Sequence, residues 1–322
     1  MARHSIPDII DQADLRQGEL RTTAQGSVVS GLVRSLRPSQ WTKNLIIFGG
    51  LLFGQRLFDV PSVVAASAAF VVFCALSGVV YLLNDVADRE ADRKHPLKRH
   101  RPIASGALST STALAAAGVI GILALGAAFW LRFEFGVFAA AYVALLAFYS
   151  GPLKHVVIID VLTIAIGFVL RAVAGAVAID VPISHWLLIL TILLALFLAL
   201  SKRRHELVLL ADGATSHRPI LEEYSPYLLD QMIAVVTAST LISYVIYTVS
   251  PETVQKFHTD YLGLTLVFPL YGIFRYLYLV HQKEGGGSPS DMLLNDRPLL
   301  ACVALWAIAV AAIIYGTSLI NG

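Results

Sequence analysis

Charge is scarce in this sequence. Only 14% of its 322 residues are Asp, Glu, Lys or Arg, whereas soluble domains average about 25%, and the mean hydropathy is +0.70. Cysteine is scarce too: Cys74 and Cys302 both lie in apolar runs, so neither a disulfide framework nor a cysteine zinc site is expected. No apolar core occurs early in the chain, so no cleavable signal peptide is predicted. These absences leave an integral membrane protein as the predicted class, with no nucleic-acid partner expected.

Long apolar runs are plentiful, and they predict an all-α polytopic membrane protein with nine transmembrane helices. A crossing helix needs about 20 apolar residues, so the first and fourth runs are short. Residues 1–38 are expected to form a polar cytosolic tail and residues 39–322 the transmembrane catalytic domain. The nine runs are Asn44–Leu57, Val63–Leu83, Ala113–Leu131, Phe135–Phe148, Val156–Ile179, Trp186–Leu200, Met232–Val249, Leu262–Val280 and Leu299–Ile320.

Basic residues are divided unequally between the two sides that nine spans define. Arg56, Arg132 and Lys256 fall in loops opposite the N-terminus, and Arg171 lies inside the fifth run, whereas the other 20 of the 24 Lys and Arg share the side of the N-terminus. Positive loops stay in the cytosol. The sequence therefore predicts a multi-pass protein of the cell (inner) membrane whose N-terminus and motif-bearing loops are cytosolic.

An acidic motif, N-D-x-x-D-x-x-x-D, follows the second run and comprises Asn84, Asp85, Asp88 and Asp92. On a continuing helix, residues three and four apart share a face, so the three carboxylates are expected to form one stripe. Such carboxylates repel one another unless a cation neutralises them, and oxygen ligands suit Mg²⁺. The alternative is a solvated helix end whose acids pair with neighbouring bases.

A basic loop, KHPLKRHRPIASG, comes directly after these acids and contains Lys98 and Arg101. Arg presents a planar fork to phosphate oxygens, and Lys adds a point charge. Cytosolic loops are commonly basic, which explains the sign of this charge but not its position. Acids followed at once by bases are the arrangement that a diphosphate–Mg²⁺ complex needs.

The acidic motif followed by R-P-x-x-S-G resembles the first signature of the UbiA superfamily of intramembrane prenyltransferases. The resemblance implies a nine-helix UbiA-like bundle with a cytosol-facing active site that needs Mg²⁺ to release diphosphate. Prenyl-transferring members carry a second aspartate-rich motif after the sixth span, but here that segment carries Lys202, Arg203, Arg204 and Glu206.

Further segments are similar to one branch, the decaprenyl-phosphate phosphoribosyltransferases of cell-wall arabinan synthesis. The similarity implies phosphoribosyl pyrophosphate as donor and a polyprenyl phosphate lipid as acceptor. Donor and acceptor together bring three anionic groups: a diphosphate, a 5-phosphate and a lipid phosphate. These groups account for the excess of bases on the cytosolic side, which are Lys43, Lys98, Arg101, Lys154, Lys202 and Arg203. The oligomeric state stays open. Asn44, at the end of the first of these segments, is a substrate-binding candidate. The similar segments are RPSQWTKN (Arg37–Asn44), Tyr81–Gly106, LKHVVIID (Leu153–Asp160), LRAVAGAVA (Leu170–Ala178), KRRHEL (Lys202–Leu207) and NDRPLL around Asp296.

Two charges lie inside the fifth run, where each costs about 2.5–3.5 kcal/mol to insert. Asp160 and Arg171 are about 16 Å apart along a helix axis, so each needs its own partner. Asp160 is expected near the cytosolic mouth, where it organises ribose or a basic side chain. A structural pair between helices is the alternative for both charges. Tyr149 is either a substrate hydrogen-bonding group or an interface aromatic.

Two other functions compete with phosphoribosyl transfer. A prenyltransferase with an aromatic acceptor shares the first motif, but the absence of the second acidic motif argues against it. A transporter or channel site lies near the membrane midplane in repeated halves, whereas the acids here cluster at one boundary and no clear repeat is visible. The sequence therefore favours an Mg²⁺-dependent transferase.

Overall fold

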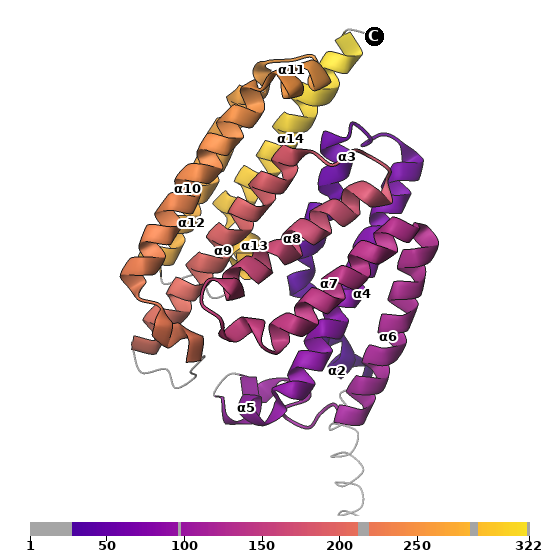
Figure 1. Ribbon diagram of the computed structural model, residues 1–322, viewed down its shortest axis with the longest axis vertical. Coiled ribbons are helices and arrows are strands. Elements are labelled where there is room, and N and C mark those ends of the chain that lie inside the picture. Colours follow the sequence, from indigo (N-terminus) through magenta and orange to yellow (C-terminus); the bar gives the residue numbers. More distant parts are fainter. Residues whose placement is uncertain (1–27, 96–97, 212–218, 284–288, 321–322) are drawn as a thin grey trace, which may run out of the picture. The chain divides into compact units, whose positions relative to one another are not determined.

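The computed structural model describes residues 28–95, 98–211, 219–283 and 289–320, and within them every regular element is a helix (Figure 1). The described helices are α2 (Val28–Ser35), η1 (Pro38–Phe48), α3 (Gly49–Phe53), α4 (Val60–Ala87), α5 (Arg89–Lys94), η2 (Lys98–His100), α6 (Thr110–Leu131), α7 (Phe133–Ser150), η3 (Leu153–His155), α8 (Ile159–Ala178), α9 (His185–Ala211), η4 (Pro219–Glu223), α10 (Pro226–Val249), α11 (Pro251–Phe257), η5 (Tyr261–Leu266), α12 (Val267–Gln282), α13 (Pro289–Asn295) and α14 (Arg297–Ile320).

The predicted apolar runs become long helices. Among the described residues, eight helices are long and apolar enough to cross a membrane, and they coincide with the second to ninth runs. The fourth run, short in sequence, gains polar ends and becomes the 18-residue helix α7. A helix satisfies all of its backbone hydrogen bonds internally, which is what hydrocarbon surroundings require. The chain is a multi-pass membrane protein.

The first run folds differently from the others. It forms the eleven-residue 3₁₀ helix η1 and the five-residue helix α3. Because a 3₁₀ helix rises about 2.0 Å per residue and an α-helix about 1.5 Å, the two together extend about 30 Å, close to the thickness of a bilayer core. A ninth crossing by this segment stays a prediction.

Close backbone contact holds η1 and α3 against α8. A Cβ built on Gly175 of α8 lies 2.2 Å from the carbonyl oxygen of Ile47, so only glycine fits there. Gly50 of α3 similarly approaches the backbone of Ala176. Asn44 of η1 is fully buried, and its side-chain oxygen accepts a 2.8 Å hydrogen bond from Nε of Arg171 on α8.

The described chain forms two units. The first contains residues 28–38 and 77–122, and its core includes Val79, Leu82, Ile103 and Leu108. The second contains residues 39–76 and 123–320. Helices α4 and α6 each contribute to both units.

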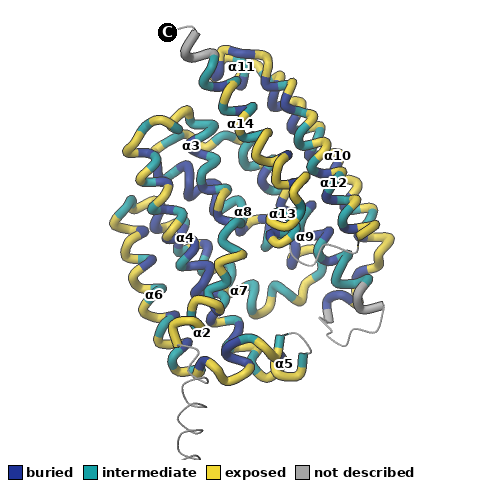
Figure 2. The backbone as a smooth tube through the Cα atoms, turned by 180° about the vertical axis from the view of Figure 1, so that it is seen from behind, coloured by how far each residue is buried: buried dark blue, intermediate teal, exposed yellow. Residues whose placement is uncertain are grey.

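Helix α8 is the most buried of the eight candidate membrane spans among the described residues. In its apolar stretch 61% of residues are buried, against 28% for α10, whose outer face is exposed (Figure 2). It packs between α7 and α9, and α9 packs in turn against α10. The two charges on α8, Asp160 and Arg171, are therefore surrounded by protein, and each must be satisfied by protein groups.

Candidate active site

The acidic motif lies in the first unit, at a break between two helices. The single continuing helix predicted from sequence is interrupted, because α4 ends at Ala87 and Asp88 precedes α5. The turn keeps its helical hydrogen bonds, with the N–H of Asp88 donating to Asn84 at 2.8 Å and that of Asp92 donating to Asp88 at 2.8 Å. The break separates the acids by environment: Asp85 and Asp92 are buried, whereas Asp88 is exposed and Asn84 half-buried.

Two arginines neutralise the buried acids. Arg37, whose guanidinium also lies 4.7 Å from the centre of the Tyr81 ring, forms a short ion pair with Asp85. Arg101, from the predicted phosphate-binding loop, uses one nitrogen, Nη1, for two bonds: 3.0 Å to Asp85 Oδ1 and 2.7 Å to Asp92 Oδ2. Both buried carboxylates therefore converge on the same guanidinium nitrogen. Lys98, in the same loop, is half-buried.

The donor set of this motif fits Mg²⁺ chemically, since it offers carboxylate and amide oxygens at a polar helix end. Its arrangement is not yet that of a metal site. In the part of the chain that the structure describes, no three His, Cys, Asp or Glu side chains are gathered closely enough to hold one ion. Asp85 and Asp92 do converge, and the atom at their meeting point is a nitrogen of Arg101. A cationic position is thus built into the site, and an arginine of the chain fills it.

A second polar cluster lies in the second unit, centred on Arg203 of α9, which is 1% exposed. Its Nε donates at 2.8 Å to Asp160, which is fully buried in the first turn of α8. Its Nη1 donates at 2.7 Å to Glu206, and its Nη2 donates at 3.0 Å to the hydroxyl of Tyr149 at the end of α7. Three of the predicted site residues thus surround a fourth. This ion pair joins α8 to α9, so it matches the structural pair between helices that was the alternative for Asp160, and a contact between Asp160 and ribose stays a prediction.

Tyr224, which sequence reasoning did not select, completes this cluster. Its hydroxyl donates to Asp160 at 2.8 Å and accepts the backbone N–H of Ile158 at 2.7 Å. Ile158 has a φ of +70°, a conformation that a β-branched residue rarely adopts. Burial raises the pKa of Tyr224 to about 12, and its hydrogen bond to Asp160 acts in the same direction. No sequence signal marks a lone tyrosine 64 positions from its partner.

The predicted lysines have different settings within the second unit. Lys202 lies 3.7 Å from Glu206 and is partly exposed. Lys43 on η1 and Lys154 on η3 are half-buried. Asn44, predicted to bind substrate, is instead buried within the protein against Arg171 and Cys74.

Arg171 is buried among neutral groups. Besides Asn44, it donates to the hydroxyl of Tyr142 at 2.6 Å and to the carbonyl of Gly167 at 3.2 Å, and its guanidinium lies 4.6 Å from the Tyr142 ring centre. These contacts join α7, α8 and η1. They match the structural alternative given for this residue, although its partners are amide, hydroxyl and ring rather than a carboxylate.

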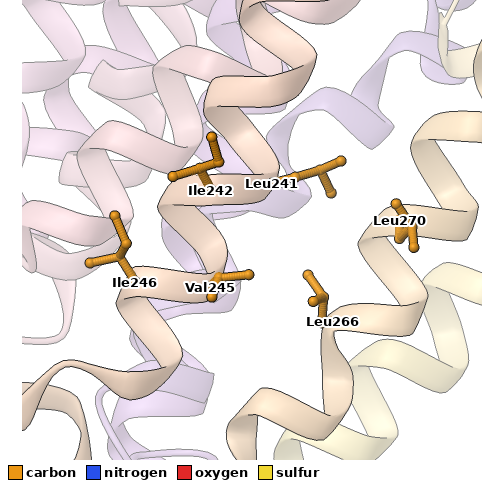
Figure 3. A pocket seen from close by; sticks show the side chains of 6 residues that line it. All are labelled: Leu241, Ile242, Val245, Ile246, Leu266 and Leu270. Carbon is orange, nitrogen blue, oxygen red and sulfur yellow. The ribbon is translucent and has the colours of Figure 1, made fainter.

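An apolar pocket of about 240 Å³ lies between α10 and the η5–α12 segment (Figure 3). It carries no polar group and so offers no chemistry of its own. Its lining residues are Leu241, Ile242, Val245, Ile246, Leu266 and Leu270.

Comparison with known proteins identifies the family to which this chain is similar. Residues 45–295 match the UbiA prenyltransferase family. The chain belongs to this family. The decaprenyl-phosphate phosphoribosyltransferase of Mycolicibacterium smegmatis is 33% identical over 301 residues, which cover 90% of this chain and 94% of that protein. The enzyme of the same name from Corynebacterium glutamicum is 29% identical, with 98% of each chain covered.

A solved UbiA structure supports the same fold. The UbiA homolog from Archaeoglobus fulgidus bound to GPP and Mg²⁺ has a TM-score of 0.67 at 19% identity, and the match covers 89% of this chain and all of that one. The chain described here carries Lys202, Arg203 and Arg204 on α9. This is the segment in which the resemblance leads one to expect a second acidic motif. Arg203 of this segment forms an ion pair with Asp160 at 2.8 Å.

Proposed function

We propose that this chain transfers the 5-phosphoribosyl group of phosphoribosyl pyrophosphate to a polyprenyl phosphate of the decaprenyl type and releases pyrophosphate. The product is a precursor of an arabinan-type cell-wall polymer. The observation that carries the proposal is the 33% identity, over nine tenths of the chain, to a decaprenyl-phosphate phosphoribosyltransferase.

The charges of the described residues support this substrate pair. The donor brings a diphosphate and a 5-phosphate, and the acceptor adds a third anion. The first unit offers one acidic motif with Lys98 and Arg101 beside it. The second unit offers Lys43 on η1, Lys154 on η3 and Lys202 on α9, each of them half-buried. Fixed cations at the positions of phosphate groups stabilise the charge that develops in transfer.

The donor set of the acidic motif fits Mg²⁺, which Asp85, Asp88 and Asp92 would hold with help from Asn84. When bound, the ion supplies neutralisation of the charge that develops on the leaving pyrophosphate. The three carboxylates orient that end of the donor, and Lys98 and Arg101 contact its phosphate oxygens.

The chemical step breaks the bond between ribose C1 and the pyrophosphate oxygen, and the electron pair leaves with pyrophosphate. A new bond forms between C1 and an oxygen of the lipid phosphate on the opposite face, so inversion at C1 is expected. The lipid phosphate is already an anion at neutral pH and needs no strong general base. The chain contributes by holding the reactants in line.

We further propose the finer topology of the chain in the inner membrane. It crosses the membrane nine times, with η1 and α3 forming one crossing, and both its N-terminus and its active site face the cytosol. The charge distribution between loops supports it. Residues 1–27 of the predicted tail lie outside the described residues.

The test is a donor competition with purified full-length protein. Labelled phosphoribosyl pyrophosphate with decaprenyl phosphate is compared with a labelled prenyl diphosphate and an aromatic acceptor. We expect label in the lipid only with the first pair, and an Asp88→Asn variant to lose about 100-fold or more in rate. Glu90→Gln, which removes an exposed acid two residues away, is the matched control. Prenyl transfer to the aromatic acceptor would establish the rival function, and an unimpaired Asp88→Asn would remove Asp88 from the metal assignment.

A further inference from the structure

Arg101 occupies an unusual position for a phosphate-binding side chain. Its Nη1 atom makes hydrogen bonds to both Asp85 and Asp92, although its own side chain is 29% exposed and theirs are 2% and 4% exposed. Arg37 contacts Asp85 alone. Among the described residues, Arg101 is thus the one base whose ion pairs join the two buried carboxylates.

The reason for this arrangement is electrostatic. Two buried carboxylates close to one another are costly when no cation lies between them. With Arg101 in place, each carboxylate has a charge-assisted hydrogen bond. A divalent ion held by Asp85 and Asp92 would compete with Nη1 of Arg101 for Asp85 Oδ1 and Asp92 Oδ2, and the two positive charges would repel one another at that distance.

The side chain of Arg101 is 29% exposed, so it can turn away from the acids by rotation about its own bonds, although Pro102 and Ile103, which follow it, are buried. Arg101 follows the short helix η2 and lies in a turn segment rather than within a long helix. Leaving the acids costs Arg101 its two carboxylate partners, and a phosphate group restores equivalent bonds because guanidinium and phosphate match geometrically. A diphosphate arriving with the metal supplies that replacement, whereas the metal alone does not.

We propose that Arg101 is an internal counter-cation that couples metal binding to diphosphate binding. It holds the carboxylates when the site is empty, competes with a divalent ion that arrives alone, and turns to the diphosphate when ion and diphosphate arrive together. This rests on the proposed function, since it assigns the metal to Asp85 and Asp92. The consequence is that the enzyme binds the metal–diphosphate complex in preference to the free metal.

The experiment measures binding of Mn²⁺ to full-length protein in detergent micelles by electron paramagnetic resonance. Mn²⁺ is added alone or as its preformed complex with inorganic pyrophosphate. Three variants are compared with the wild type: Arg101→Gln, which removes the charge; Arg101→Lys, which retains a charge without the planar fork; and Arg99→Gln. Arg99 is an exposed base of the same loop, two residues away, and controls for loss of one positive charge.

Opposite shifts are expected for the two ligands. Arg101→Gln binds Mn²⁺ alone about tenfold more tightly than the wild type and binds the Mn²⁺–pyrophosphate complex about tenfold more weakly, within the usual range of coupling between sites. Arg101→Lys lies between the two, which keeps the test informative if the Gln variant folds poorly. Arg99→Gln shifts both ligands by less than about threefold.

Two results overturn the inference, and they are distinguishable. If the wild type binds the Mn²⁺–pyrophosphate complex but Arg101→Gln binds free Mn²⁺ no more tightly than Arg99→Gln does, the coupling role of Arg101 is wrong and the proposed function stands. If the wild type binds neither form of Mn²⁺, the metal assignment to the acidic motif fails, and the coupling role fails with it.

Discussion

Replacing Arg203 by Met tests how strongly the buried cluster of the second unit depends on one charge. The substitution conserves the length of the apolar stem but removes the guanidinium. Asp160 is then left fully buried, and its carboxylate keeps the hydrogen bond from the hydroxyl of Tyr224. Glu206 keeps access to water and lies near Lys202, so its loss is small.

The loss of unfolding free energy comes from the carboxylate of Asp160, which stays buried without its cationic partner. Breaking a buried ion pair by removing one partner costs about 3–5 kcal/mol, because the remaining charge is desolvated and unpaired. Asp160→Asn is milder, about 1–3 kcal/mol, since Arg203 retains Glu206 and Tyr149. In the double variant no buried carboxylate is left behind. Its cost should therefore fall below the sum of the single costs by about 2 kcal/mol.

Reversible unfolding in mixed detergent–SDS micelles, followed by circular dichroism, gives these free energies. Arg204→Met is the matched control: Arg204, itself 18% exposed, lies on the same helix but pairs with Asp230, which is 40% exposed and keeps contact with water when the arginine is removed. Exposed pairs contribute about 0–1 kcal/mol. If Arg203→Met costs no more than Arg204→Met, or if the double variant is additive, the argument from burial is wrong.

Three further predictions concern the fold and its pH dependence. Tyr224→Phe removes one donor and one acceptor and should cost about 1–3 kcal/mol of unfolding free energy; because the pKa of Tyr224 is raised to about 12, the wild type alone should lose this contribution as pH rises from about 10 to 12. Gly175→Ala places a methyl group 2.2 Å from a carbonyl oxygen of η1 and should cost about 1–3 kcal/mol in the same assay, whereas Gly126→Ala, with open space around it, should cost nothing. The Arg275 guanidinium holds the pKa of Asp296 below its usual range, so their pair stabilises the fold above about pH 4 and is lost as pH falls through the folded pKa. The free energy of unfolding, measured from about pH 5 to 2, should therefore fall less steeply in Asp296→Asn than in the wild type.

The sequence by itself determined the class of the protein and eight of its crossings. A helix in hydrocarbon needs only its own backbone bonds and an apolar surface, and both requirements are local. The family was visible for a similar reason, since its signature from Asn84 to Gly106 is contiguous in sequence.

Tertiary structure decided which charges meet. Arg37 and Asp85 are 48 positions apart, Asp160 and Arg203 are 43 apart, and Asn44 and Arg171 are 127 apart. Such pairs depend on which helix faces which and on their axial register, and no local pattern encodes either. The contact of the 3₁₀ helix η1 with Gly175 of α8 likewise joins segments that are far apart in the sequence.

The acidic motif shows the division most clearly. Its spacing determined that three carboxylates follow one another at a helix end. Packing decided that Asp85 and Asp92 are buried around one nitrogen of Arg101 while Asp88 faces solvent. Burial and charge pairing are properties of the assembled surroundings, so the residues of a site can be predicted from spacing, whereas their charge partners come only from the folded chain.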